Sequence, residues 1–178
     1  AMPLGPGQPT SFLAELGKRE SFDDLQLSGA LLVDLYELIG RPGVHYKSGF
    51  FSLAERFFRD SGADVQFVHA DFRRFAPILR ELNPRVMCTV ATPPDSNGYM
   101  SLSLHAGASV DELHRAGAHP ERLLIVETNP LFPRTFGMPP DHRHAIHVDE
   151  ADIIVEGTKP PIELPEIEST PVTEAIAE

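Results

Sequence analysis

The sequence predicts an α/β fold in which a mostly parallel sheet is flanked by helices. The continuous apolar runs VMCTVA at 86–91 and LLIVET at 123–128 are typical of strands that a parallel sheet buries on both faces. A third run, DIIVE at 152–156, has a similar character, and we expect these three to be the central strands. Segments with helical spacing lie between strand candidates, and this alternation favours βαβ units.

In the first half of the chain, local patterns predict six elements. In order, they are a helix at 11–20, a strand or else a helix at 30–37, a loop or short strand at 44–52, a helix at 53–62, a strand at 63–70 and a turn or helix at 71–83. For 30–37 the strand is preferred. In the second helix, Leu53, Phe57 and Phe58 share a face that we expect to be buried. The last helix is expected to be interrupted by Pro77.

The second half alternates more regularly. Besides the three central strands, YMSLSL at 99–104 predicts a short strand because apolar and polar residues alternate. Residues 108–119 predict a helix with Ser109 as N-cap and Glu112 three positions later, the spacing of a capping box. The proline-rich and acidic stretch 157–171 predicts an ordered linker or arm.

The two ends of the chain predict a piece of a longer protein. The first twelve residues, AMPLGPGQPTSF, are typical of a loop with no element before it. Near the other end, Thr170 and Pro171 suit the start of a helix, but only about one turn follows. We therefore expect one domain at 1–157, lacking its first elements, and a linker with the start of a second domain at 158–178.

Composition argues against several classes of partner. A formal net charge of −11 and a pI near 5.1 disfavour nucleic acid and anionic membranes. No apolar run reaches the roughly 20 residues of a membrane-spanning helix, and no secretory signal is recognisable. The single cysteine, Cys88, lies in an apolar run and is interpreted as a buried filler in a reducing, cytoplasmic setting.

Two proline-rich loops directly follow buried strands. TPPDSNGY at 92–99 follows the strand 86–91, and TNPLFPRTFG at 128–137 follows the strand LLIVE at 123–127. Because parallel strands end at the same edge of a sheet, where α/β proteins bind ligands, we expect both loops to border one site. Pro93 and Pro94 stiffen the first loop, and Asp95 can accept hydrogen bonds from nearby backbone N–H groups.

These segments resemble motifs of the acetyl-CoA hydrolase/transferase family, which includes CoA-transferases that use butyrate, 4-hydroxybutyrate or succinate. PPDSNGYMSLS at 93–103 is similar to the family's PPD-x-x-GY-x-SLG, with Ser103 in place of the final glycine. ETNPLFPRTFG at 127–137 resembles E-x-N-x-x-x-PRT-x-G, and IHVDEADIIVE at 146–156 resembles IHV-x-x-x-D-x-hydrophobic-VE. GPGQPTSFLAEL at 5–16 is similar to the glycine- and proline-rich loop before the family's first helix.

The resemblance implies the N-terminal half of a two-part enzyme with the CoA-transferase-like (NagB/RpiA-type) fold and a site between its halves. It implies that a glutamate carboxylate from the C-terminal half attacks the acyl-CoA thioester, so no residue of this chain is predicted to be catalytic. Glu127 and Glu156, at strand ends, are interpreted as structural. The implied partners are acyl-CoA and a small carboxylate, the C-terminal half, and further copies in a homo-oligomer. Coenzyme A is implied as a substrate, with no tightly bound cofactor.

Three loops are expected to supply the substrate-binding residues. These are Gly5, Gly7, Gln8, Pro9, Pro93, Pro94, Asp95, Gly98, Tyr99, Asn129 and Arg134. Gln8 is a candidate donor to an acyl carboxylate or to the thioester, and glycine lets the backbone around it approach a ligand. Arg134 is a candidate for bidentate binding of a substrate carboxylate, or else for an ion pair that holds its loop. Ordinary turns remain the alternative for the loops at 5–9 and 92–99.

Other functions stay open at this point. His142, His144 and His147 lie close in sequence, but their spacing fits no well-defined zinc pattern, so no metal site is predicted. A sugar-phosphate isomerase-like domain would require a basic phosphate pocket. A non-enzymatic binding or assembly module would use the arm at 160–171 to dock a partner. An enzyme half would expose an apolar surface where the other half docks.

Overall fold

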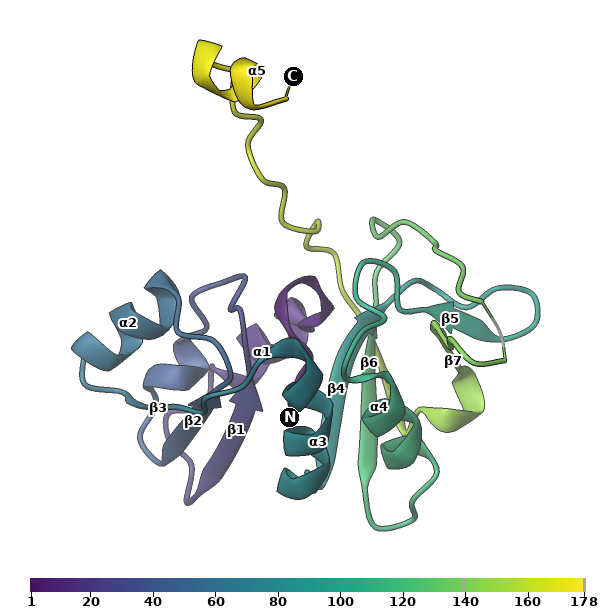
Figure 1. Ribbon diagram of the computed structural model, residues 1–178. Coiled ribbons are helices and arrows are strands. Elements are labelled where there is room, and N and C mark those ends of the chain that lie inside the picture. The colour runs from purple at the N-terminus through teal and green to yellow at the C-terminus, as the bar shows by residue number, and fades with distance from the viewer. Residues whose placement is uncertain (139, 178) are drawn as a thin grey trace.

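The computed structural model describes residues 1–138 and 140–177, and its strands form a twisted, mostly parallel sheet with helices on both faces (Figure 1). Two three-stranded parallel sheets have the orders β1-β2-β3 and β4-β6-β8, and β5 pairs with β7 in an antiparallel ribbon. The strands are β1 Leu25–Gly29, β2 Val44–Ser48, β3 Asp64–Phe67, β4 Val86–Ala91, β5 Tyr99–Ser101, β6 Leu123–Thr128, β7 Ala145–His147 and β8 Ile153–Glu156. The α/β class predicted from the sequence is confirmed.

An extended segment at residues 1–5 joins the two parallel sheets. On one side, the Met2 N–H donates to the Ser28 carbonyl of β1 at 3.0 Å. On the other side, the Cys88 N–H of β4 donates to the Ala1 carbonyl at 3.0 Å. The segment runs parallel to β1, so the combined order is β3-β2-β1-(1–5)-β4-β6-β8. The prediction of a simple loop at the start of the chain was therefore wrong for residues 1–4.

Two apolar cores lie on opposite faces of this sheet. Successive strand residues point to opposite faces, so Met87 and Leu124 join one core, while Cys88 and Ile125 join the other. The first core also contains side chains of α3 and α4, and the second contains side chains of α1, α2 and the 3₁₀ turn η2. The helical elements are η1 Gly5–Gly7, α1 Thr10–Leu16, η2 Glu37–Gly40, α2 Leu53–Asp60, α3 Phe72–Leu82, α4 Val110–Gly117, η3 Val148–Glu150 and α5 Pro171–Ala177.

Several predictions of element position, burial and pairing were wrong. The strand expected at 30–37 lies earlier, at β1, and Leu31 turns the chain with a φ of +51°, which no strand has. Of the three residues expected on the buried face of α2, only Phe58 is buried, whereas Leu53 is 82% exposed and Phe57 is also exposed. Helix α3 continues through Pro77. DIIVE forms β8, which pairs with β6 alone among the described strands, so it lies at an edge of the sheet instead of its centre.

The expected capping box of α4 is also absent. The Ser109 side chain makes no capping hydrogen bond at the start of this helix. The Glu112 carboxylate instead lies 2.7 Å from the guanidinium groups of both Arg115 and Arg122. These ion pairs bind Glu112 to the helix end and to the residue before β6, so the carboxylate is not free to turn back toward the helix start.

The chain after β8 leads away from the sheet toward α5 (Figure 1). Residues 157–170 form no helix or strand, and their apolar side chains Ile162, Leu164 and Ile167 are exposed. The hydroxyl of Thr170 accepts the Thr173 N–H at 3.2 Å, which confirms the predicted helix start. Across residues 1–138 and 140–177, none of the helices combines the length and apolar character that crossing a bilayer would require.

Candidate functional site

The motif loops meet at the carboxyl edge of the sheet. Strands β4 and β6 pair in parallel, so the loops at 92–98 and 129–137 leave the sheet at the same edge. The glycine-rich loop at 5–9 follows the extended segment 1–5 and leaves at this edge too. From that segment the chain moves to β1 on one side and later to β4 on the other, which makes a topological switch point. Such points are where open α/β sheets bind ligands.

The loop at 92–99 is a tight hairpin that Asp95 organises. Its Oδ1 accepts the N–H groups of Tyr99 and Asn97, each at 2.9 Å. These two bonds, the one from Tyr99 first, hold the pKa of the Asp95 carboxyl below its usual value. Gly98 has a φ of +83°, and a Cβ there would lie 2.6 Å from the ring of His147. The hairpin therefore needs both Asp95 and Gly98 for its own shape.

Arg134 fastens its own loop to this hairpin. Its Nη2 donates to the Pro93 carbonyl at 2.6 Å, and its Nη1 donates to the Tyr99 carbonyl at 3.2 Å. The Asp95 carboxylate lies 3.6 Å from the same guanidinium. These contacts favour the interpretation in which Arg134 holds the loop. Binding of a substrate carboxylate by Arg134 stays a prediction.

Buried hydroxyl groups interlock the same two loops. Ser101 Oγ donates to the Thr135 carbonyl at 2.9 Å and accepts the Thr135 N–H at 3.1 Å. Thr135 Oγ1 donates to the Ser103 carbonyl at 2.9 Å, and Ser103 Oγ donates to the Pro133 carbonyl at 2.6 Å. Ser103 has a φ of +55°, which explains why the family pattern has glycine at this position.

Gln8 is fully engaged inside the protein. Its Nε2 donates to the carbonyls of Ala30 and Leu31 at 2.8 and 3.1 Å. Its Oε1 accepts the Tyr36 hydroxyl at 3.0 Å and the Val33 N–H at 3.2 Å. An amide side chain has two N–H donors and one carbonyl oxygen, so none of its hydrogens is left for a ligand. The expected donation from Gln8 to a substrate would require breaking one of these bonds, and its evident role is to hold the turn at Leu31.

The rest of the glycine-rich loop is a short 3₁₀ turn at the carboxyl edge. Gly5 has a φ of +50°, and Pro9 directly precedes α1. The Gly7 carbonyl accepts the hydroxyl of Thr89 from β4 at 3.3 Å. The backbone of Gly7 also lies against the ring of His105, where a Cβ would come within 2.8 Å of the imidazole Cδ2.

His105 was missed by the sequence reasoning. The only signal was its place two residues beyond Ser103, the last position of the family-like segment. Burial lowers the pKa of the His105 ring, so the imidazole is neutral near pH 7. The structure thus adds a neutral imidazole to the loops expected at the site.

Glu127 and Asn129 anchor neighbouring segments at the end of β6. Glu127 is completely buried, and its Oε2 accepts the Phe12 N–H in the first turn of α1 at 2.9 Å. Asn129 donates to the Lys159 carbonyl at 2.6 Å. Both contacts agree with structural roles, and neither side chain lies open at the edge.

Among the residues that the structure describes, no three His, Cys, Asp or Glu side chains are placed to hold a metal ion. His147 faces the Asn97 carbonyl at 3.0 Å, and the ring of His144 lies 6.2 Å from that of Phe136. His144 and His147 thus make separate contacts.

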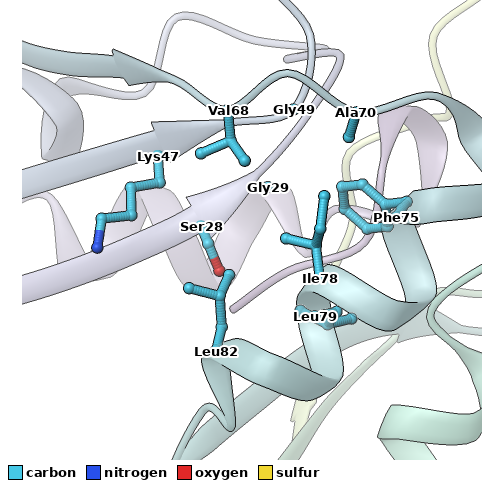
Figure 2. A pocket seen from close by; sticks show the side chains of 10 residues that line it. All are labelled: Ser28, Gly29, Lys47, Gly49, Val68, Ala70, Phe75, Ile78, Leu79 and Leu82. Carbon is cyan, nitrogen blue, oxygen red and sulfur yellow. The ribbon is translucent and has the colours of Figure 1, made fainter.

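Several hollows lie away from the motif loops. One, between α3 and the strands β1 and β2, is lined mainly by apolar side chains, and Lys47 at its rim points away from Phe75 and Leu79 (Figure 2). Its volume of about 20 Å³ accommodates a water molecule but no acyl group. A groove of about 730 Å³ lies at the amino ends of the strands, beside Leu25, Val86 and Leu123. The carboxyl edge remains the better candidate because the motif loops converge there.

Large apolar side chains are also exposed on the loops at the carboxyl edge. Phe136 is 83% exposed and Met138 is 70% exposed, and Leu104 and Leu131 are exposed nearby. Such exposure is unusual for a free surface and is expected where a further part of a protein docks. What covers these side chains stays a prediction.

Comparison with known proteins agrees with the family motifs. No family model matches the chain. The chain is 30% identical over 182 residues to the succinyl-CoA:cyclohexane-1-carboxylate CoA transferase of Geobacter metallireducens. The alignment covers 98% of the chain and 38% of that protein. The crystal structure of RipA from Yersinia pestis matches 94% of the chain with a TM-score of 0.77 and 26% identity, over 40% of its own length.

A more distant structure shares the fold alone. The 4-hydroxybutyrate CoA-transferase of Porphyromonas gingivalis matches 91% of the chain and 36% of its own length, with a TM-score of 0.59 and 15% identity. The chain thus spans 38% of the length of the curated relative that it matches. In its motifs, its fold and its sequence, the chain therefore resembles part of a CoA transferase.

Proposed function

We propose that the full-length protein transfers coenzyme A from an acyl-CoA to a small carboxylate, and that this domain shapes the acyl or carboxylate side of the site. The observation that carries the proposal is the 30% identity to a CoA transferase across 98% of the chain. The convergence of the three motif loops at one edge of the sheet supports it, because that edge is the usual ligand site of the fold.

The proposed chemistry is covalent catalysis by a carboxylate outside this chain. That carboxylate attacks the thioester carbonyl, and the thiolate of coenzyme A leaves as a mixed anhydride forms. The thiolate then attacks the enzyme's acyl carbon, which releases the donor acid and leaves an enzyme thioester. The acceptor carboxylate completes the exchange by the reverse sequence.

The residues described here act by holding the substrate-facing loops in a fixed geometry. Arg134 and Asp95 fix the hairpin at 92–99, and Gln8 fixes the turn beside the glycine-rich loop. Fixed loops keep the reacting groups close and oriented, which lowers the entropic part of the barrier. Glu127 is unsuited to attack a thioester because it is completely buried and bonded to α1.

Two other functions are less well supported. A sugar-phosphate isomerase-like site would need cations, but the loops at 5–9, 92–98 and 129–137 carry a single basic side chain, Arg134, which binds backbone carbonyls. An assembly module would find support in the exposed apolar residues Ile162, Leu164 and Ile167 of the arm. The activity of the full-length protein separates the three.

The test is a CoA-exchange assay on the full-length protein. Acetyl-CoA, butyryl-CoA or succinyl-CoA is supplied with acetate, butyrate, 4-hydroxybutyrate or succinate, and the CoA esters are separated by chromatography. We expect new CoA esters that depend on the acceptor, and little release of free thiol. Thiol release without an acceptor would identify a hydrolase instead. Absence of both reactions would contradict the enzymatic proposal, and the 178-residue chain alone is expected to be inactive.

A further inference from the structure

Lys159 is the point at which the chain after β8 is last tied to the domain. Its carbonyl accepts the side-chain amide of the buried Asn129 at 2.6 Å. Its ammonium group forms an ion pair with the Asp34 carboxylate. At 160–177, the hydrogen bonds that the structure shows stay within that range, and none of its ion pairs involves these residues. Everything beyond Lys159 is therefore oriented by the contacts of this one residue.

The two contacts of Lys159 lie on opposite sides of the extended segment at residues 1–5. Asn129 follows β6, whereas Asp34 lies in the turn after β1. The residue directly before Asp34 donates its N–H to Gln8 Oε1 at 3.2 Å, so this turn is joined to the glycine-rich loop. Lys159 thus bridges the topological switch point, beside the candidate site.

Two points of attachment fix a direction, whereas one point fixes only a position. The Asn129 bond holds the backbone at Lys159 but allows the chain to turn about that point, and the ion pair removes this freedom. Pro160 and Pro161 follow directly. Proline fixes its own φ and keeps the residue before it extended, so the direction set at Lys159 is carried into the arm at 160–171.

We propose that Lys159 is a positioning residue, whose ion pair with Asp34 aims the arm so that the part of the full-length protein beyond it brings its reacting carboxylate over the glycine-rich loop. This inference rests on the proposed CoA-transferase function. Extended at about 3 Å per residue, the arm is about 35 Å long, and a turn of about 2° at its base moves its far end by about 1 Å. A misplacement of that size can slow catalysis by about a hundredfold.

The ion pair contributes little to the stability of the domain itself. Both side chains are partly exposed, and exposed ion pairs stabilise proteins only slightly. Removing the pair should therefore leave the thermal midpoint within about 2 °C of the wild type, whereas an arm that is no longer aimed should slow turnover. Slower turnover at unchanged stability is the signature that separates positioning from support of the fold.

The test is the CoA-exchange assay on the full-length protein carrying Asp34→Asn or Lys159→Met. Each substitution should lower kcat by about tenfold and change the KM of the acceptor by less than about twofold, because the contacts of the substrate itself stay in place. Lys159→Arg keeps the charge and should retain most of kcat. The matched control is Lys18→Met, which breaks the exposed Lys18–Glu15 ion pair at the end of α1 and should leave kcat unchanged.

Three results would overturn the inference. A kcat within about twofold of the wild type in both Asp34→Asn and Lys159→Met would show that the arm needs no such aim. A fall in the thermal midpoint of more than about 5 °C in both variants would show that the pair supports the fold. A raised KM in Lys159→Met with kcat unchanged, and no effect of Asp34→Asn, would make Lys159 a ligand of the substrate.

A second measurement does not depend on turnover. The isoleucine methyl groups of the full-length protein are isotopically labelled, and their order parameters are measured by NMR. In Asp34→Asn we expect the Ile162 methyl group in the arm to become more mobile, while Ile154 in β8 stays unchanged. Equal mobility of Ile162 in variant and wild type would overturn the inference. Greater mobility in a protein that transfers no CoA would instead refute the proposed function and leave the hold of the ion pair on the arm intact.

Discussion

Replacing Ser103 tests whether backbone strain explains the glycine of the family pattern. Ser103 is buried and holds a φ of +55°, and its Oγ donates to the Pro133 carbonyl at 2.6 Å. The substitutions Ser103→Gly and Ser103→Ala both remove this hydrogen bond, but only glycine relieves the strain. Comparing the two variants therefore isolates the effect of the left-handed backbone from that of the hydroxyl.

The structure sets the expected magnitudes. Loss of the hydrogen bond should lower the free energy of unfolding by about 0.5–1.5 kcal/mol in both variants. A left-handed conformation destabilises a non-glycine residue by about 1–2 kcal/mol, so glycine at this position gains that much over alanine. The greater freedom of glycine in the unfolded chain offsets about 0.4–1 kcal/mol of this gain. The glycine variant should therefore be more stable than the alanine variant by about 1 kcal/mol, and close to the wild type.

Urea denaturation followed by circular dichroism measures these differences. The matched control is Ser109, another buried serine, whose φ of −91° is ordinary and whose hydroxyl caps nothing. At that position alanine should be more stable than glycine, the reverse of the order at Ser103. If alanine at 103 proves as stable as glycine, the strain argument fails.

Three further predictions concern the loops around the candidate site. Gln8→Leu removes the four hydrogen bonds of this buried side chain and should lower the free energy of unfolding by about 3 kcal/mol or more. Urea denaturation measures this loss, and a loss below about 1 kcal/mol would contradict the role assigned to Gln8. Because the folded-state pKa of Asp95 is depressed, its stabilising contribution is present above the unfolded-state pKa of about 4 and is lost as the pH falls through the lower folded-state value. Hydrogen exchange at 95–99, compared with the intrinsic exchange rates, should therefore accelerate as the pH falls below about 4, and Asp95→Asn should remove that dependence. Gly157→Ala places a Cβ within 2.1 Å of Glu127 Oε1 and should lower the free energy of unfolding by about 2 kcal/mol or more. The control is Gly40→Ala, where a Cβ would meet nothing within 4 Å and stability should change little. Equal losses of stability in the two variants would refute the crowding argument.

Strands with a strong local pattern could be predicted, and those that depend on distant partners could not. VMCTVA and LLIVET carry enough apolar residues to identify β4 and β6 without any neighbour. The strand β1 is LQLSG, a weak pattern that becomes a strand because β2 and residues 1–5 pair with its two sides. The stronger apolar run that follows it misled the prediction, since Tyr36, Leu38 and Ile39 are buried from a loop and a 3₁₀ turn.

The location of the candidate site could be predicted, but not the contacts of its side chains. Parallel pairing alone places the loops after β4 and β6 at one edge. The partners of Gln8 and Arg134 are mainly backbone groups, which have no signature in a sequence. His105 was missed because its significance comes from contact with Gly7, which lies far away in the chain.

The extended segment at residues 1–5 constrains how the domain can fold. Both strands that flank it are synthesised after it, and the amino group of Ala1 reaches the Val86 carbonyl across 85 positions of the chain. During translation the segment can pair with β1 once that strand has been made, but its side toward β4 stays unpaired until the ribosome has passed β4. Closing such a distant pairing is slow and leaves unpaired edges available to other chains. The pairing of this segment with β4 is therefore expected to close late, and chains that have not yet closed it expose an edge at which they can associate with one another.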